Sequence, residues 1–384
     1  MPKFWSDEEV IEAVRTEGSV AAAARKLGAN SKALRCRVQR LKASMARRGY
    51  SPEHGLNTPY PDGYYNAKTT IQRGPEGDIE RTWERMTADA QQQQELMLRT
   101  VEALEARVSG LAKPTEKPRQ SSSDQLLAAY MVGDAHLGMR AWQQETGVEH
   151  FDTEIATNDL RGAITHLVSS APPSHTGMLV NVGDFLHAND TTSQTPASKN
   201  LLDTDGRYGD VIDHAVEVLA FAIDAMLHKH QRVRVINARG NHDPDAALWL
   251  NRLIAAYYRR EPRVEVIPND AKFIYMRWGQ CLVGIHHGDR IKRQQLYEAM
   301  TRDRRRDWGE CDKSYFWTGH IHHKNAEEIG GCLFESFNTL AAPDSFHAAH
   351  GYGAGREMQC LILNKQHGIV ARNVCSLEMA RMAT

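Results

Sequence analysis

The second half of the chain alternates short apolar runs with longer amphipathic segments. Residues 127–132, 178–182, 233–237, 281–285 and 315–318 are mostly apolar and have the length of buried strands. Between them lie segments with a helical spacing of apolar positions, such as residues 211–230. Strands that alternate with helices predict an α/β domain, which we place at residues 126–384.

The first fifty residues predict a small all-α domain. A serine followed by acidic residues, and then apolar positions at helical spacing, predicts a helix over residues 6–17. Ser19 is expected to cap a short helix over residues 20–27, and Ser31 to cap a third helix over residues 31–48. A glycine-containing turn at residues 28–30 gives residues 1–49 the spacing of a helix-turn-helix domain. Leu34, Val38 and Leu41 are expected to pack inward on the first two helices.

Residues 50–125 are predicted to connect these two domains. Residues 50–86 form a linker rich in Pro, Gly and Asn at its start, with a small hairpin predicted within residues 69–83. A helix is predicted over residues 87–111, and a flexible linker follows over residues 112–125.

The predicted linker helix carries an apolar seam. Its apolar residues recur at alternating steps of four and three: Met97, Val101, Leu104, Val108 and Leu111. This spacing is typical of a coiled coil and favours a homodimer. Only about two heptads are strongly apolar, so packing of the helix on its own domain is the alternative.

The composition is that of a globular protein of at least two domains. The chain has 384 residues, of which 41% are hydrophobic and 25% charged. No run approaches the ~18 apolar residues of a membrane span, and the start lacks the apolar centre of a signal peptide. Six scattered cysteines without a CxxC pair indicate reduced thiols. We therefore expect a cytoplasmic protein, in the host cytoplasm if the chain is phage-encoded, without a membrane partner.

The charges are unevenly distributed. Residues 1–49 contain 11 Lys and Arg against 5 Asp and Glu, whereas the net charge of the whole chain is −1. A basic segment on a mildly acidic body indicates a polyanionic partner. The candidate DNA contacts on the third helix are Lys32, Arg35, Arg37 and Arg40. The alternative is a helical bundle whose basic face is only solvated or binds protein.

Five short motifs of carboxylate, amide and imidazole side chains follow the five predicted strands. They are Asp134-Ala-His136, Gly183-Asp184, Gly240-Asn241-His242-Asp243, His286-His287-Gly288-Asp289 and Gly319-His320-Ile321-His322. The carboxyl ends of strands are where an α/β fold gathers its active site. Oxygen and imidazole ligands without cysteine suit Mn²⁺, Fe or Zn²⁺, with Mg²⁺ as a further candidate, and they argue against a structural zinc site.

The five motifs, in this order, resemble the signature of the calcineurin-like metallophosphoesterase superfamily. The resemblance covers about residues 126–365 and implies a sandwich of two sheets flanked by helices. It implies that one metal binds Asp134, His136, Asp184 and His322, and that the other binds Asp184, Asn241, His287 and His320. Asp184 would bridge two divalent ions, with Mn²⁺ the first choice. Two such ions activate a water-derived hydroxide for attack on phosphorus and neutralise charge in the transition state.

Further roles follow from the same resemblance. His242 would donate to the leaving oxygen or stabilise the transition state, and Asp243 would orient His242. In the fourth motif the ligand is assigned to His287, because it directly precedes Gly-Asp, and His286 is the alternative. His187, Asn189 and His323 are expected beside the ligands or on the substrate side.

The surrounding sequence looks most like the SbcD-type nucleases of DNA repair and the bacteriophage enzymes related to them. Only 62 residues follow the last motif, so an ATPase partner is not expected. Arg290 and Arg293 lead a cluster of cations that either lines a DNA backbone or forms a solvated helix face. The first hypothesis is a two-metal DNA phosphodiesterase, an exonuclease, an endonuclease or both. The alternatives are a phosphoesterase for small substrates, either a phosphomonoesterase or a nucleotide phosphodiesterase, and a DNA-binding regulator that uses the fold as a scaffold.

Overall fold

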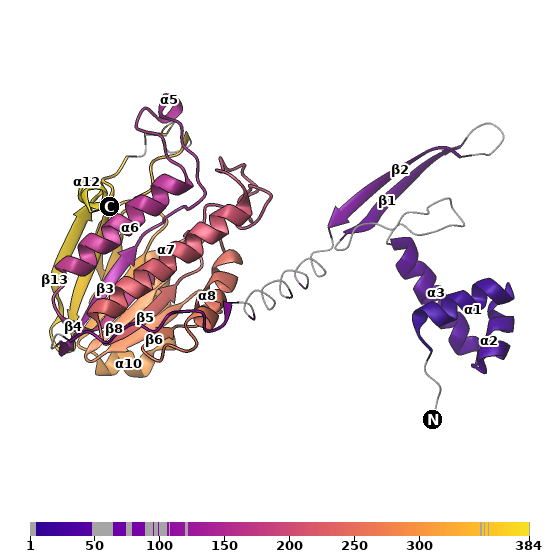
Figure 1. Ribbon diagram of the computed structural model, residues 1–384, viewed down its shortest axis with the longest axis horizontal. Helices are drawn as coiled ribbons and strands as arrows, with labels where there is room; N and C mark the ends of the chain where they lie inside the picture. Colours follow the sequence, from indigo (N-terminus) through magenta and orange to yellow (C-terminus); the bar gives the residue numbers. More distant parts are fainter. Residues whose placement is uncertain are drawn as a thin grey trace. The chain divides into compact units, whose positions relative to one another are not determined.

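The computed structural model divides the chain into two compact units, Met1–Ala103 and Leu104–Thr384 (Figure 1). The structure describes residues 5–47, 64–73, 79–88, 108–119, 122–345, 350, 351 and 353–383, together with residues 95, 99, 106 and 348. Each unit is described by itself.

Three helices form the first part of the N-terminal unit. They are α1 (Asp7–Glu17), α2 (Val20–Leu27) and α3 (Ser31–Arg47). Ser6 and Glu9 form a capping box at α1, and Ser19 accepts a hydrogen bond from the Ala22 amide at α2. The cap of α3 differs from the prediction: Asn30, not Ser31, accepts hydrogen bonds from the amides of Lys32 and Ala33. An asparagine side chain reaches the free N–H groups of a first turn as well as serine does.

A small apolar core joins these helices. Val10 of α1, Ala23 of α2, and Leu34 and Val38 of α3 are buried in one cluster, and Leu41 packs against it. The inward packing predicted for the third helix is confirmed. Arg37 is fastened to the first helix, because its guanidinium donates to Asp7 and to the Trp5 carbonyl.

A two-stranded antiparallel sheet forms the second part of the N-terminal unit. Its strands are β1 (Tyr64–Arg73) and β2 (Ile79–Ala88). Thr87 pairs with Tyr65 and Ala88 with Tyr64, so the helix predicted from Thr87 starts later than we expected. Glu95, Arg99, Ala106 and Val108 are helical. The other residues of that helix, with most of its apolar seam, lie outside the described residues, and pairing through it stays a prediction.

Two sheets form the centre of the second unit. The first has the order β13-β12-β3-β4-β5-β6, and its strands are β3 (Ser123–Val132), β4 (Ser174–Asn181), β5 (Arg232–Asn237), β6 (Val264–Val266), β12 (Glu357–Asn364) and β13 (Gly368–Ser376). The second has the order β10-β11-β9-β8-β7, and its strands are β7 (Ile274–Trp278), β8 (Cys281–Ile285), β9 (Lys313–Thr318), β10 (Asn325–Ile329) and β11 (Cys332–Ser336). Strands β3 to β6 are parallel to one another in the first sheet, whereas β12 is antiparallel to both β3 and β13. In the second sheet β8, β9 and β11 are parallel to one another.

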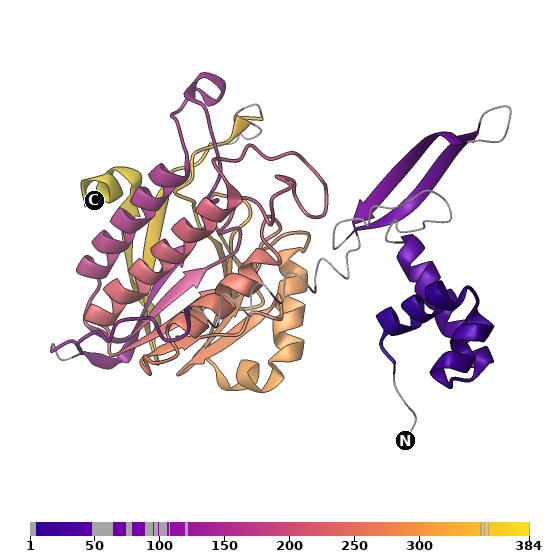
Figure 2. The same cartoon turned by 45° about the vertical axis from the view of Figure 1, so that its right-hand side comes forward.

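The two sheets pack face to face and are flanked by helices (Figures 1 and 2). Met178 and Ile236 of the first sheet share one buried cluster with Val283 and Trp317 of the second. The helices of this unit are α5 (Gln143–Thr146), α6 (Thr153–Ser170), α7 (Tyr208–Lys229), α8 (Ala246–Tyr257), α9 (Arg293–Asp303), α10 (Arg305–Glu310) and α12 (Leu377–Met382). Helices α6 and α7 cover the outer face of the first sheet, and α9 packs on the outer face of the second. The predicted mixed α/β fold with two sheets is confirmed.

The segment predicted as a flexible linker is bound to the second unit where the structure describes it. The Ala112 amide donates to the Tyr257 carbonyl, and Arg263 donates to the carbonyls of Thr115 and Leu227. Glu261 pairs with the same buried guanidinium. A guanidinium has five N–H donors, more than one carboxylate can accept from, and the backbone carbonyls of Thr115 and Leu227 accept from the others. Ala112, Thr115 and Pro118 of the linker predicted over residues 112–125 thus make hydrogen bonds to the second unit, and the flexibility of the linker stays a prediction.

No helix among the described residues is long and apolar enough to cross a membrane. All six cysteines are free, and four of them are buried: Cys281, Cys332, Cys360 and Cys375.

We predict that a buried histidine on the outer side of the first sheet makes the stability of the fold depend on pH. His230 lies between the Tyr130 hydroxyl and the Ser174 carbonyl, at 2.8 Å from each, and burial lowers its pKa to about 4. In the unfolded chain the imidazole is protonated near pH 6.5, whereas in the folded protein it stays neutral down to about pH 4. The free energy of unfolding therefore decreases as the pH falls from about 6.5 to 4. Urea unfolding should show this loss to be smaller in His230→Gln than in the wild type, by up to about 3 kcal/mol. Equal pH slopes for the two proteins would contradict it.

Candidate metal centre

The five predicted ligand motifs lie directly after five strands of the two sheets. Asp134 follows β3, Asp184 follows β4 and Asn241 follows β5 in the first sheet, whereas His287 follows β8 and His320 follows β9 in the second. The carboxyl ends of these parallel strands meet at one end of the sandwich. The fold therefore gathers side chains that are up to 188 positions apart, from Asp134 to His322.

Among the described residues, three groups of three hold their candidate ligand atoms within 4.8 Å of one another, and one of them, His136, His187 and His242, contains histidines only. The other two groups combine a carboxylate with two histidines. Of these two, the first group contains Asp134, His136 and His322, and the second contains Asp184, His287 and His320. These groups follow the division into two ligand sets that the family resemblance implied. Asn241 joins the second, since its Oδ1 lies 3.0 Å from His287 Nε2.

The second group brings together atoms that suit a cation. His287 Nδ1 lies 3.1 Å from the Val182 carbonyl, to which it donates. His287 Nε2 lies 3.0 Å from both Asp184 Oδ2 and Asn241 Oδ1, and both oxygens are acceptors. If Nε2 carries no hydrogen, the lone pairs of this nitrogen and of the two oxygens point toward the same place. A divalent metal at that place would accept all three as ligands.

The first group has the same character. His136 Nε2 and His322 Nε2 are 3.0 Å apart, and Asp134 Oδ1 lies 3.9 Å from the latter. His136 Nδ1 faces His187 Nδ1 at 3.2 Å. A hydrogen on His136 Nδ1 that is donated to His187 leaves Nε2 free for a metal, which is the usual arrangement around ligand histidines. The residues of both groups thus fit two divalent ions.

Electrostatics also favour positive charge in the centre. Burial opposes the charged form of His287, yet the carboxylates of Asp184 and Asp134 outweigh it and raise its pKa to about 10. Burial alone would raise the pKa of Asp184, but His287 holds it below the usual range. Burial raises the pKa of Asp134 to about 7, with Asp184 adding to the rise and His287 opposing it. The carboxylates therefore require a proton or a cation between them.

Several candidate ligands have strained backbone. Among the described residues, eight that are not glycine have positive φ, and five of these are Asp134, His136, Asp184, His320 and His322. Left-handed backbone is costly for residues with a side chain and persists where the surroundings impose it. The strain is concentrated at the residues that the motifs single out.

The motif glycines allow the loops to approach one another. A Cβ on Gly240 would lie 1.9 Å from Asp184 Oδ1, and one on Gly183 would lie 2.5 Å from His287 Nδ1. A Cβ on Gly319 would lie 2.7 Å from Asp134 Oδ2. These glycines are required because a ligand of a neighbouring strand occupies the space of their side chain.

His242 lies beside the first group, but its orientation differs from the prediction. Its amide donates to Asp184 Oδ1 at 2.8 Å, and its Nδ1 lies 2.8 Å from the His187 carbonyl. The carboxylate of Asp243 accepts from the amides of Leu186 and Gly240 instead of the His242 ring. The expectation that Asp243 orients His242 was wrong, because Asp243 is fully buried behind the loops and joins two of them.

His187, Asn189 and His323 occupy different surroundings. His187 is buried, stacks on His242 at 5.3 Å and has its pKa lowered to about 3 by burial. Asn189 Oδ1 accepts from the amides of Asp245 and Ala246 at the start of α8. His323 is exposed, with Nδ1 2.7 Å from the Ile321 carbonyl. The motifs did not indicate Thr339, whose hydroxyl donates to the Asp134 carbonyl, since a hydroxyl 205 positions away has no local signal.

The structure separates the two adjacent histidines of the fourth motif. His287 belongs to the second ligand group, whereas His286 Nδ1 accepts from the Gly288 amide and its ring lies 4.8 Å from that of Phe273. Both residues follow the end of β8, and only His287 turns toward the second ligand group.

This separation predicts a selective loss of metal binding. Mn²⁺ should raise the melting temperature of the wild type and of His286→Ala, but by much less for His287→Ala, since a ligand that binds only the folded state stabilises it. Calorimetry with and without metal measures the shift. A larger Mn²⁺-dependent shift in His287→Ala than in His286→Ala would assign the ligand to His286.

The candidate DNA contacts are partly engaged within the protein. Lys32, Arg35 and Arg40 are exposed on α3, but Arg37 is held by Asp7. In the second unit Arg290 is exposed, whereas Arg293 donates to Asn325 and Glu327. Arg37, a candidate DNA contact, and Arg293, a candidate for a DNA backbone or a solvated helix face, thus make intramolecular pairs, and their contact with DNA stays a prediction.

Comparison with known proteins gave matches among solved structures alone. No family model matches the chain, and no curated protein matches it. An archaeal phosphodiesterase is 14% identical over 64% of this chain and 99% of its own, with a TM-score of 0.33. The phosphoesterase YfcE of E. coli is 15% identical over 64% of this chain and 98% of its own, with a TM-score of 0.31. Vacuolar protein sorting 29 of Cryptosporidium parvum is 14% identical over 65% and 96%, with a TM-score of 0.30. Similarity at this level carries no inference about this chain.

Proposed function

We propose that the protein is a phosphodiesterase that depends on two divalent metals and hydrolyses DNA. The observation that carries this proposal is the convergence of the two ligand groups, with carboxylate, amide and imidazole atoms within 4.8 Å in each group. We assign one metal to Asp134, His136 and His322 and the other to Asn241, His287 and His320, with Asp184 shared by both. Mn²⁺ is the first choice.

The metals, when bound, would lower the pKa of water and neutralise charge on the phosphate. The protein side chains supply the remaining functions. His242 is half-buried beside His136, with ring centroids 4.8 Å apart, and its backbone amide holds Asp184. Because Nδ1 of His242 faces the His187 carbonyl, Nε2 is the atom left to meet a phosphate or leaving oxygen.

DNA as the substrate is supported by the N-terminal unit. Lys32, Arg35 and Arg40 are exposed on α3, with Leu34 and Val38 on its buried face. A helix that is anchored on one side and cationic on the other suits the phosphates of a groove.

The decisive experiment is a degradation assay with Mn²⁺ on linear duplex DNA, single-stranded DNA and a small phosphomonoester. We expect cleavage of DNA that EDTA abolishes. Turnover of the phosphomonoester with DNA intact would replace the proposal by a small-substrate phosphoesterase. Binding of DNA without turnover of either would favour a regulator.

The role of α3 is tested by its salt dependence. Replacing Lys32, Arg35 and Arg40 together with alanine should weaken DNA binding and lower the slope of log K against log salt by about three, if each contacts one phosphate. Replacing Arg15, Arg25 and Lys26 of α1 and α2 removes the same charge from the same unit and is the matched control. Equal slopes in both triple variants would refute a specific role of α3.

A further inference from the structure

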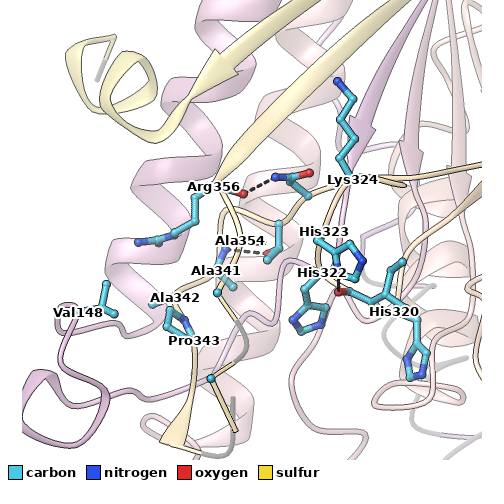
Figure 3. Close-up of a pocket in the computed structure, with 16 residues that line it drawn as sticks. Val148, His320, His322, His323, Lys324, Ala341, Ala342, Pro343, Ala354 and Arg356 are labelled. Carbon is cyan, nitrogen blue, oxygen red and sulfur yellow. Dashed lines mark hydrogen bonds between the residues drawn. The ribbon is translucent and has the colours of Figure 1, made fainter. Parts of the chain in front are cut away.

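A cavity beside the metal centre has no role in the function described so far. Its volume is about 1010 Å³, and it lies between residues 320–324, the segment around residues 338–343, and Gly351 with residues 353–356 (Figure 3). His320 and His322 line it and also belong to the two ligand groups. Whatever occupies the cavity is therefore next to the phosphate in the proposed reaction.

The walls of the cavity are mostly small and apolar. Val148, Ala341, Ala342, Pro343 and Ala354 line one side, and Figure 3 shows His322 and His323 across from them. Small side chains leave room for a ligand, and the exposed imidazole of His323 lines the same cavity. A planar group stacks well in such a space.

The charges along the cavity do not suit a second phosphate. Arg356 donates to Glu149 and to the Leu340 carbonyl, and it lies 3.7 Å from Asp159, so its charge is compensated. Lys324 extends away from the rings of His320 and His322 (Figure 3). No carboxylate belongs to the described residues that line the cavity. An uncharged group fits this lining best.

One polar atom on the wall lacks a partner. Asn338 is 9% exposed and lines the cavity, and its Nδ2 donates to the Gly355 carbonyl. Its Oδ1 is buried without a hydrogen bond. A buried acceptor of this kind normally has a donor, and an N–H group of a ligand supplies one when the Asn338 amide turns toward the cavity.

We propose that this cavity receives one unpaired nucleobase of the substrate strand, next to the scissile phosphate. A nucleobase is planar and uncharged, carries N–H donors at its edge and is attached to a phosphate through a sugar. The inference rests on the proposed function. It adds that the base must leave its stack before cleavage, so single-stranded DNA and frayed ends are cleaved faster than the interior of a duplex.

The test measures the contribution of the base to binding. The probes are 2′-deoxyadenosine 5′-monophosphate, which carries base, sugar and phosphate, and 2-deoxyribose 5-phosphate, which lacks the base. Titration calorimetry of the full-length protein with Mn²⁺ should give about tenfold tighter binding of the nucleotide. Ala354→Trp, at an exposed position of the wall, fills part of the cavity, and Ala354→Ser is its matched control.

We expect Ala354→Trp to lose the preference for the nucleotide while its affinity for deoxyribose phosphate is unchanged, and Ala354→Ser to retain both. No preference in the wild type, or an undiminished one in Ala354→Trp, would overturn the base site. DNA cleavage with no preference refutes this inference alone. A preference without DNA cleavage refutes the proposed nuclease and leaves the base site standing.

Discussion

Replacing Asp184 with asparagine is expected to lower Mn²⁺-dependent DNA hydrolysis by about 10³-fold or more. Asp184 is buried, lies 3.0 Å from His287 Nε2 and accepts the His242 amide at 2.8 Å. Asparagine keeps the shape and the hydrogen bond of this side chain but removes its charge. Without this charge the metals are bound less tightly and the transition state is less stable. A loss of about 4 kcal/mol corresponds to about a 10³-fold lower rate.

The measurement is kcat/KM on single-stranded DNA over a range of Mn²⁺ concentrations. Asp213→Asn, at an exposed position of α7, makes the same chemical change away from the centre and should leave the rate unchanged. Activity of Asp184→Asn within tenfold of the wild type would show that the carboxylate does not hold the metals.

The second large effect is expected from Gly240→Ala, although residue 240 has no side chain to contribute. The added Cβ would lie 1.9 Å from Asp184 Oδ1 and 2.3 Å from the Asp184 amide nitrogen, so Asp184 or the Asn241 loop must move. A displacement of about 1 Å at a catalytic group costs about 10²-fold in rate. Overpacking of this kind also destabilises a fold by about 1–3 kcal/mol.

Gly209→Ala is the matched control, because a Cβ at this position of α7 meets no atom within 4 Å. It should leave kcat/KM unchanged and alter the unfolding free energy by no more than about 1 kcal/mol, in the stabilising direction. Full activity of Gly240→Ala would mean that the approach of the two loops is not needed for the reaction.

The strands that carry the centre were predictable because each is a short apolar run followed by a polar motif. The predicted runs at residues 233–237 and 281–285 coincide with β5 and β8. The structure brings Asp134, His136 and His322 together, and Asp184, His287 and His320 together, because the carboxyl ends of parallel strands lie at one edge of a sheet. That the residues bind metals and cleave DNA stays a proposal.

Partners across the chain were not predictable. Asp243 turned out to join Leu186 and Gly240, and Arg37 to be paired with Asp7. Hydrogen bonds between distant segments produce no periodic pattern in a sequence. The role of a charged residue near a motif therefore cannot be read from the sequence.

The sequence by itself determined the α/β class, the order of the strands with their motifs, and the residue types that suit a pair of divalent metals. The tertiary structure alone decided that the segment around Thr115 is fastened to Arg263 and that a cavity lies beside His320 and His322. It also placed His287, which the sequence had favoured over His286, beside Asp184 and His320. The physical reason is the range of the interactions. Apolar periodicity and strand ends are local properties of the chain, whereas side-chain orientation, buried pairs and cavities depend on how distant segments pack.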